Sequence, residues 1–133
     1  MRLEITQRAD LAVRALVLLG RSPARLKGGQ LSAALGTTPG FMPQVMSPLV
    51  GAGWVRSEPG PTGGYHLVVR PEEVSVLAVI EAVDGATDDG RCVVADHPCA
   101  RRAPCVLHTA WVRAREELIG ALRTTTVAEV GAW

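Results

Sequence analysis

The chain has 133 residues and a formal net charge of +1, and 47% of its residues are hydrophobic although only 4% are aromatic. This length fits one globular domain, or a small domain with an extension, whose core consists mainly of aliphatic side chains. An apolar run near the amino terminus is interrupted by Asp10 and Arg14, which argues against a secretion signal, and no stretch is long enough to span a membrane. We therefore expect a cytoplasmic protein without a membrane partner.

Charge is distributed unevenly along the chain. Residues 1–70 carry eight Lys and Arg against three Asp and Glu, whereas residues 71–133 carry six against ten. A basic first half followed by an acidic second half indicates a part that binds a polyanion and a part with another task. We expect a DNA-binding domain over residues 1–70 and a second unit over residues 71–133.

The first half is expected to contain three helices. Apolar residues recur at three- and four-residue steps over residues 6–20, and a short helix follows at residues 30–35. A turn at residues 36–39 comes next, where Thr38 is a suitable N-cap and Pro39 a suitable first residue for a third helix that reaches about residue 52. A short helix, a glycine-containing turn and a helix are typical of the helix-turn-helix, although an ordinary pair of antiparallel helices has the same cues.

The third helix is the candidate recognition helix. Gln44 is its clearest base reader, because a side-chain amide can pair with adenine. Thr37, Thr38 and Ser47 are candidates for contacts to phosphates or bases. Pro43 lies early enough in the helix to cost little, whereas Pro48 removes a backbone hydrogen bond from its interior.

A hairpin is expected directly after this helix pair. Two strand-like runs, residues 54–58 and 65–68, are joined by a loop rich in glycine and proline. A hairpin in this position is a wing, which favours DNA binding over a plain helical hairpin. Arg56 and the backbone amides of Gly63 and Gly64 are then expected near the DNA backbone.

The second half is expected to be mainly helical. Ser75 caps a helix that ends at Asp84 and Gly85, and the longest helix follows Cys105 and reaches about residue 123. Residues 126–129 match a capping box for a last short helix. Heptad-like spacing on the long helix marks a candidate dimer seam, formed by Leu107, Trp111, Ala114, Leu118 and Ala121.

All three cysteines lie in one segment, Cys92, Cys99 and Cys105, within an expected loop at residues 90–105, and His108 follows. Three thiolates and an imidazole suit a transition metal or an iron–sulfur cluster. A helix that begins near Pro104 would place Cys105 and His108 on one face. A structural zinc site, a disulfide with one free thiol, and unliganded cysteines are the alternatives; structural zinc sites usually have shorter gaps between cysteines.

The order of these motifs resembles that of the Rrf-type bacterial transcription regulators. The matching segments are the opening residues 1–3 (MRL), residues 10–16 (DLAVRAL), the wing residues 62–65 (TGGY), residues 80–85 (IEAVDG), and three cysteines before a long helix. The resemblance covers nearly the whole chain. It implies a mostly α fold with a small β wing, that is, a winged helix-turn-helix domain with a long dimerisation helix, and a homodimer that binds double-stranded DNA at a palindromic operator.

The resemblance also implies a 2Fe–2S or 4Fe–4S cluster, held by Cys92, Cys99 and Cys105, whose state sets DNA affinity. His108 matches the fourth ligand of one branch of the family. Asp10 matches the aspartate that another branch, which senses nitric oxide, contributes from the opposite subunit, and we favour Asp10.

The leading hypothesis is therefore a transcription regulator, expected to be a repressor, in which an iron–sulfur cluster senses nitric oxide, redox state or cluster supply. The alternative is a winged-helix regulator with structural zinc or a cysteine thiol switch. An enzyme is not expected, because no catalytic triad, phosphate-binding loop or pair of acid/base carboxylates is present.

Overall fold

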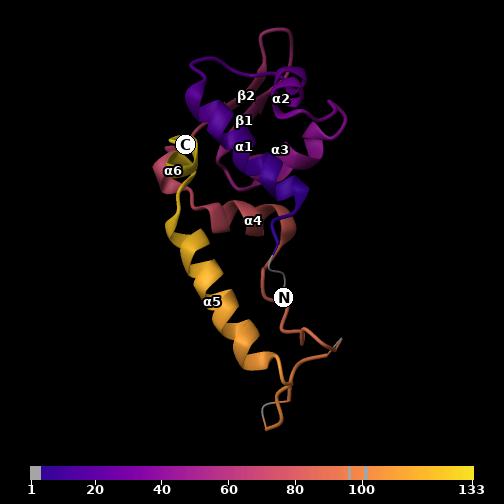
Figure 1. Cartoon of the computed structure of the whole chain (residues 1–133). Coiled ribbons are helices and arrows are strands. Elements are labelled where there is room, and N and C mark those ends of the chain that lie inside the picture. The colour runs from indigo at the N-terminus through magenta and orange to yellow at the C-terminus, as the bar shows by residue number, and fades with distance from the viewer. Residues whose placement is uncertain (1–3, 96, 101) are drawn as a thin grey trace.

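The computed structural model describes residues 4–95, 97–100 and 102–133, so the opening residues 1–3 of the family resemblance lie outside the described part. Figure 1 shows a body of helices that carries a hairpin at one end and a long helix that runs down to the cysteine loop. The elements are α1 (Gln7–Arg21), α2 (Gly28–Leu35), α3 (Met42–Gly51), β1 (Val55–Glu58), β2 (Gly64–Leu67), η1 (Pro71–Glu73), α4 (Val76–Asp84), α5 (His108–Thr124) and α6 (Val127–Gly131). The expected mostly helical class with one small β hairpin is confirmed.

Helix α1 is the centre of the core. Its apolar residues recur so closely that it is buried on several sides, and it contacts α2, α3, α4 and α6. The largest completely buried side chains include Leu16 of α1, Leu31 of α2 and Met46 of α3. Val79 of α4 and Val127 of α6 belong to the same cluster. The division at residue 70, drawn from charge, stays a prediction, and one core joins the two sides of it.

The start of α1 is tied to the end of α4. The Thr6 side chain caps α1 by accepting a hydrogen bond from the Ala9 N–H at 3.1 Å, and its hydroxyl donates to Asp84 Oδ2 at 2.7 Å. Arg8 donates to the Val83 carbonyl at 2.6 Å and lies 3.6 Å from the Asp84 carboxylate. These contacts fix the first turn of α1 against α4.

Helix α3 begins later than the sequence indicates. Thr38 is not its N-cap and Pro39 is not its first residue, since the helix begins at Met42 with Phe41 at the cap position. Phe41 and Met42 instead close a tight turn by donating to the carbonyls of Thr38 and Pro39 at 3.1 and 3.3 Å. This turn places Met42 in the core. Pro43 then falls in the first turn and Pro48 inside the helix, as expected.

The hairpin is antiparallel, with Val55 paired to Leu67 and Glu58 to Gly64. Leu26 pairs with Tyr65 through two backbone hydrogen bonds of 2.8 and 3.0 Å, so the chain before α2 lies along the second strand. Gly63 and Gly64 are needed in this hairpin because neighbouring backbone lies too close for a side chain. A Cβ on Gly63 would lie 2.1 Å from the Glu58 carbonyl oxygen, and a Cβ on Gly64 would lie 2.8 Å from the Leu26 carbonyl oxygen. Gly64 also has a φ of +132°, which side chains disfavour.

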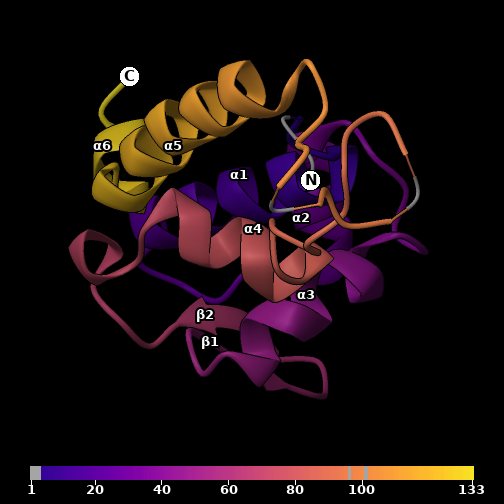
Figure 2. The same ribbon diagram turned by 90° about the horizontal axis from the view of Figure 1, so that it is seen from below.

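Helix α5 begins at His108 rather than near Pro104. A turn closed by the His108 N–H and the Cys105 carbonyl at 3.1 Å precedes it, so Cys105 is not on a helical face with His108. Figure 2 shows α5 and α6 running along one side of the body. Ser75 caps α4 by accepting from the Ala78 N–H, and Thr126 and Glu129 form the expected capping box of α6. Among the described residues, no helix has the length and apolar character needed to cross a membrane.

Candidate functional site

The three cysteine sulfur atoms lie close together in the structure. All lie within 4.8 Å of one another, although the cysteines are spread over fourteen residues of the chain. Each is a free, half-buried thiol. They occupy the loop between α4 and α5, at the opposite end of the molecule from the hairpin (Figure 1). A loop without regular structure can bring three thiols this close only by folding around them, which suits a metal or a cluster.

A cavity of about 370 Å³ adjoins this cluster of thiols. The three cysteines line it together with residues of α5 that include His108, Trp111 and Arg115. His108 lines the cavity, but its ring nitrogens do not join the group of sulfur atoms that lie within 4.8 Å of one another. Asp10 of the same chain does not line the cavity, because it is exposed on α1 and lies 3.5 Å from Arg14.

The thiols differ in acidity. The backbone N–H of Val94 donates to Cys92 Sγ at 3.4 Å and, together with the Cys99 thiol, lowers the pKa of Cys92 to about 7. At Cys99 the Cys105 backbone N–H lowers the pKa, but the neighbouring sulfur atoms of Cys92 and Cys105 together with burial raise it above its ordinary value. Cys92 therefore deprotonates more readily than Cys99, and the thiolate is the form that binds metal.

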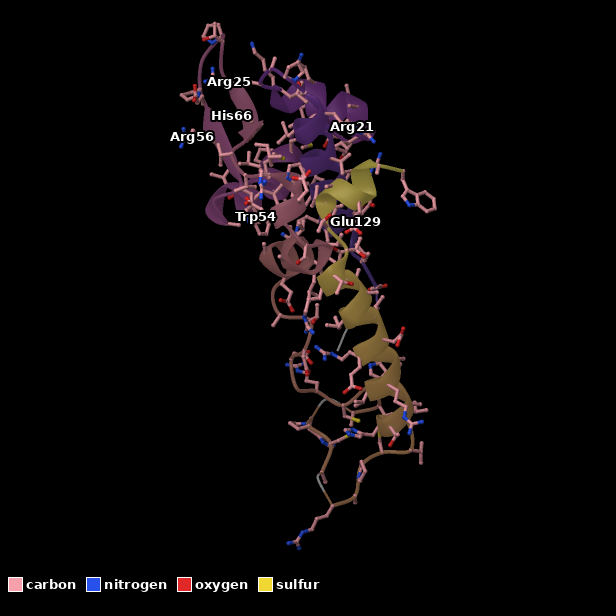
Figure 3. The ribbon with its side chains drawn as sticks, turned by 90° about the vertical axis from the view of Figure 1, so that its left-hand side faces the viewer. Arg21, Arg25, Trp54, Arg56, His66 and Glu129 are labelled. Carbon is pink, nitrogen blue, oxygen red and sulfur yellow. The ribbon has the colours of Figure 1, made fainter. Side chains whose placement is uncertain are left out.

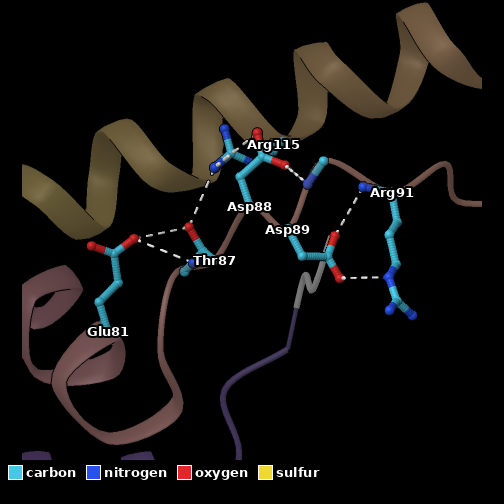
Figure 4. A network of polar contacts seen from close by, with 7 residues as sticks. Glu81, Thr87, Asp88, Asp89, Arg91 and Arg115 are labelled. Carbon is cyan, nitrogen blue, oxygen red and sulfur yellow. Dashed lines mark hydrogen bonds and ion pairs between the residues drawn. The ribbon is translucent and has the colours of Figure 1, made fainter. Parts of the chain in front are cut away.

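Polar contacts link the loop to both neighbouring helices (Figure 4). Thr87 is buried, and its N–H and hydroxyl donate to Glu81 Oε1 of α4 at 3.3 and 3.1 Å. Arg115 of α5 donates to the Thr87 hydroxyl at 3.3 Å and lies 3.9 Å from the Asp88 carboxylate. The sequence shows no sign of this arrangement, because its members are far apart in the chain and share no spacing pattern.

Two buried donors beside the cavity have no acceptor in the described part of the chain. They are Trp111 Nε1 and Arg115 Nε. A buried N–H without an acceptor is costly, so a cavity with such donors fits an occupant that carries acceptor atoms. Three thiols that can ligate a metal, beside two N–H groups that can donate hydrogen bonds, fit an anionic metal–sulfur group.

A second candidate surface lies on α3. Its buried face carries Met42, Val45, Met46 and Leu49, which leaves Gln44 and Ser47 exposed on the other face. Thr38 is exposed and Thr37 is half-buried in the turn before the helix. Thr38, Gln44 and Ser47 are therefore accessible, and the last two lie on the exposed face of α3.

The hairpin carries the remaining predicted DNA contacts. Arg56 is exposed and pairs across the strands with His66, whereas Gly63 is buried and Gly64 half-buried. Figure 3 shows Arg25, His66 and Arg56 along the hairpin. Arg25 and Lys27 line a hollow of about 730 Å³ beside His66. The sequence alone did not indicate either basic residue, because only the pairing of Leu26 with Tyr65 brings them to the hairpin.

The predicted seam of α5 is divided between two environments. Leu107, Ala114 and Ala121 are exposed, whereas Trp111 and Leu118 are half-buried against the rest of the chain. Leu118 lines a small apolar cavity of about 120 Å³ with Ile119 and Leu122. The accessible part of the seam is therefore its 107, 114 and 121 positions.

The sequence matches known regulators over nearly its full length. Residues 5–132 match the Rrf2 family, described as "Iron-dependent Transcriptional regulator". The HTH-type transcriptional regulator IscR of Serratia proteamaculans is 32% identical over 130 residues, which cover 96% of this chain and 79% of that protein. The IscR of Aliivibrio salmonicida is 32% identical over 111 residues, covering 82% of this chain and 66% of the relative.

Solved structures share the fold. CymR of B. subtilis, described as the global cysteine regulator of that organism, superposes with a TM-score of 0.80 at 20% identity and covers 98% of both chains. The T. potens IscR gives a TM-score of 0.72 at 19% identity, covering 96% of this chain and 85% of the other. At these identities the likeness concerns the fold alone, which is that of winged-helix regulators.

Proposed function

Since this chain belongs to the Rrf2 family of transcription regulators, and is a DNA-binding regulator rather than an enzyme, we propose that an iron–sulfur cluster sets its affinity for DNA. The observation that carries the proposal is the convergence of three thiols within 4.8 Å at the edge of a cavity. Cys92, Cys99 and Cys105 would hold the cluster. Changes in redox state, nitric oxide and cluster supply are the signals that such a group responds to when bound, because it exchanges electrons and loses iron to strong ligands.

The protein supplies the connection from this site to DNA. The loop holds the thiols, Thr87 and Arg115 connect the loop to α4 and α5, and α4 packs against α1 and α3. A rearrangement of the loop would therefore act on the elements that carry Gln44. We propose that the chain works as a homodimer through α5, so that two α3 helices reach successive half-sites of a palindromic operator, about one helical turn or a multiple apart.

DNA recognition is tested at Gln44 and Arg56. Gln44→Ala should lower discrimination at one base position by about 1–3 kcal/mol. Arg56→Ala should weaken binding to all sequences alike and reduce the slope of log K against log salt by about one for each phosphate that is no longer neutralised. Binding to the operator and to single-base variants of it, measured by fluorescence anisotropy over a range of salt, checks both expectations. An unaltered operator preference and salt slope would contradict the winged-helix placement.

The fourth ligand is tested by Asp10→Ala and His108→Ala, each reconstituted anaerobically. We propose Asp10 of the partner subunit, because a bond to α1 joins the cluster directly to the DNA-binding part. Asp10→Ala should therefore change the absorbance of the cluster and its effect on DNA affinity. His108 lies in the cavity and is the alternative. A cluster altered only by His108→Ala, with a normal DNA response in Asp10→Ala, would exclude the cross-subunit ligand.

A thiol switch is the second candidate function. The pKa of Cys92 at about 7 makes a substantial fraction of this thiol reactive at neutral pH. Its neighbour Cys99 lies within 4.8 Å, so an oxidant would need only a small loop movement to join the two sulfur atoms. Metal-free protein that changes its DNA affinity on oxidation, and recovers on reduction, would support this function over the cluster.

A further inference from the structure

Helix α5 contributes two side chains with N–H groups to the lining of the cysteine cavity. Trp111 and Arg115 lie one helical turn apart, and both line the cavity. Trp111 Nε1 and Arg115 Nε are buried without an acceptor among the described residues. Leaving such a donor unpaired away from water is unfavourable. Because both residues line one cavity, we expect the occupant of that cavity to carry atoms that accept hydrogen bonds from these donors.

Arg115 is held in place by its other end. Its Nη2 donates to the Thr87 hydroxyl at 3.3 Å, and Thr87 is fixed in turn by Glu81. The Asp88 carboxylate lies 3.9 Å away but is 56% exposed, whereas the Arg115 side chain is only 21% exposed. Water therefore screens the charge of Asp88 more than that of Arg115. Arg115 thus brings a guanidinium charge to the cavity lining, which the carboxylates of Asp88 and Glu116 share.

We propose that Trp111 and Arg115 are positioning residues that donate hydrogen bonds to sulfur atoms of the bound iron–sulfur cluster and raise its reduction potential. This inference rests on the proposed function. Hydrogen bonds to sulfur and nearby charge are among the properties that set the potential of such clusters. The step concerned is the gain of one electron from an external one-electron donor, with no bond made or broken. Reduction adds negative charge, so a neighbouring cation and N–H donors stabilise the reduced form.

The test compares reduction potentials of anaerobically purified variants. Arg115→Gln removes the charge, Arg115→Lys keeps the charge without Nε–H, and Trp111→Phe keeps the ring without its N–H. Arg113→Gln is the matched control, because Arg113 is exposed on the same helix and does not line the cavity. Iron, sulfide and visible absorbance are measured first, and a redox titration follows.

At the potential that half-reduces the wild-type cluster, Arg115→Gln should lower the ratio of reduced to oxidised cluster by about tenfold, which for one electron is about 59 mV. Trp111→Phe and Arg115→Lys should shift it less in the same direction, and Arg113→Gln should not shift it. Loss of the cluster from Arg115→Gln but not from Arg115→Lys would also support the inference.

Two results would overturn the inference while leaving the proposed function intact. One is full iron content with an unchanged potential in Arg115→Gln and Trp111→Phe. The other is loss of the cluster from both Arg115 variants together with a lower melting temperature, which would assign Arg115 to the fold. A wild-type protein without iron and sulfide would instead overturn the proposed function and this inference with it.

Discussion

Replacing any one of Cys92, Cys99 and Cys105 with alanine should remove the cluster from anaerobically purified protein. Each thiolate supplies a negative charge and a soft donor that water cannot replace. We expect bound iron to fall by more than about tenfold, since loss of even an outer-shell partner of a metal site typically costs that much affinity. Iron and sulfide analysis, with visible absorbance, measures the effect.

A matched control for these variants is Val94→Ala. Val94 lies in the same loop with its side chain 63% exposed, and the substitution keeps the N–H that donates to Cys92. It should retain iron. None of the three cysteines belongs to the buried core cluster, so the variants should melt like metal-free wild-type protein. A cysteine variant with wild-type iron content would show that this cysteine is not a ligand, and zinc in place of iron would favour the structural-zinc alternative.

Ala114→Glu should convert the proposed homodimer to monomers. Ala114 is exposed in the single chain, so a glutamate there costs the isolated fold little. In a dimer seam the same carboxylate would be buried beside apolar side chains without a partner, which costs several kcal/mol. Leu118 is a poorer choice for this test, because it also packs against its own chain. Light scattering of wild-type and variant protein at equal concentration measures the change.

Thr109→Glu is the control for the seam. Thr109 is exposed, and at helical spacing it lies on the opposite face of α5 from Ala114. Thr109→Glu introduces the same side chain as Ala114→Glu, and we expect the dimer to remain. If Ala114→Glu leaves the mass unchanged, or if both variants dissociate equally, the seam at positions 107, 114 and 121 is not the subunit contact.

The sequence predicted those parts of the fold that local chemistry determines. Ser75 and Thr126 cap their helices as expected, and the Gly85 stop after α4 is confirmed, because each depends on neighbours within four residues. The predicted beginning of α3 was wrong, whereas the long helix follows Cys105 as expected but does not begin as early as Pro104. Thr38 has a suitable side chain for a cap, but the turn that places Met42 in the core prevents a helix from beginning there. The turn after Cys105 likewise places the first residue of α5 at His108. Packing and loop closure at these two points exceed the local preference.

The candidate site was predictable where residue type alone is informative. Three cysteines in one loop indicated a site, and the structure brings their sulfur atoms together. Arg25 reaches the hairpin only through strand pairing, and Arg115 reaches the cavity only because α4 and α5 pack together. Contacts of this kind join residues that have no fixed spacing, so no periodicity in the sequence marks them.

The backbone also fixes α5 at its carboxyl-terminal end. The Val76 N–H donates to the Thr125 carbonyl and the Val127 N–H to the Val74 carbonyl, both at 2.9 Å, while the amino-terminal end of the helix meets the cysteine loop. Its 17 residues span about 25 Å at 1.5 Å per residue. The helix is thus fixed at the end beside α4 and α6, and a rotation about that end moves its other end the most. A tilt of α5 by about 5° about its fixed end corresponds to a displacement of about 2 Å at the cysteine end, given that length. Angstrom-scale changes in the cysteine loop therefore become small rotations of α5 at the body that carries α3.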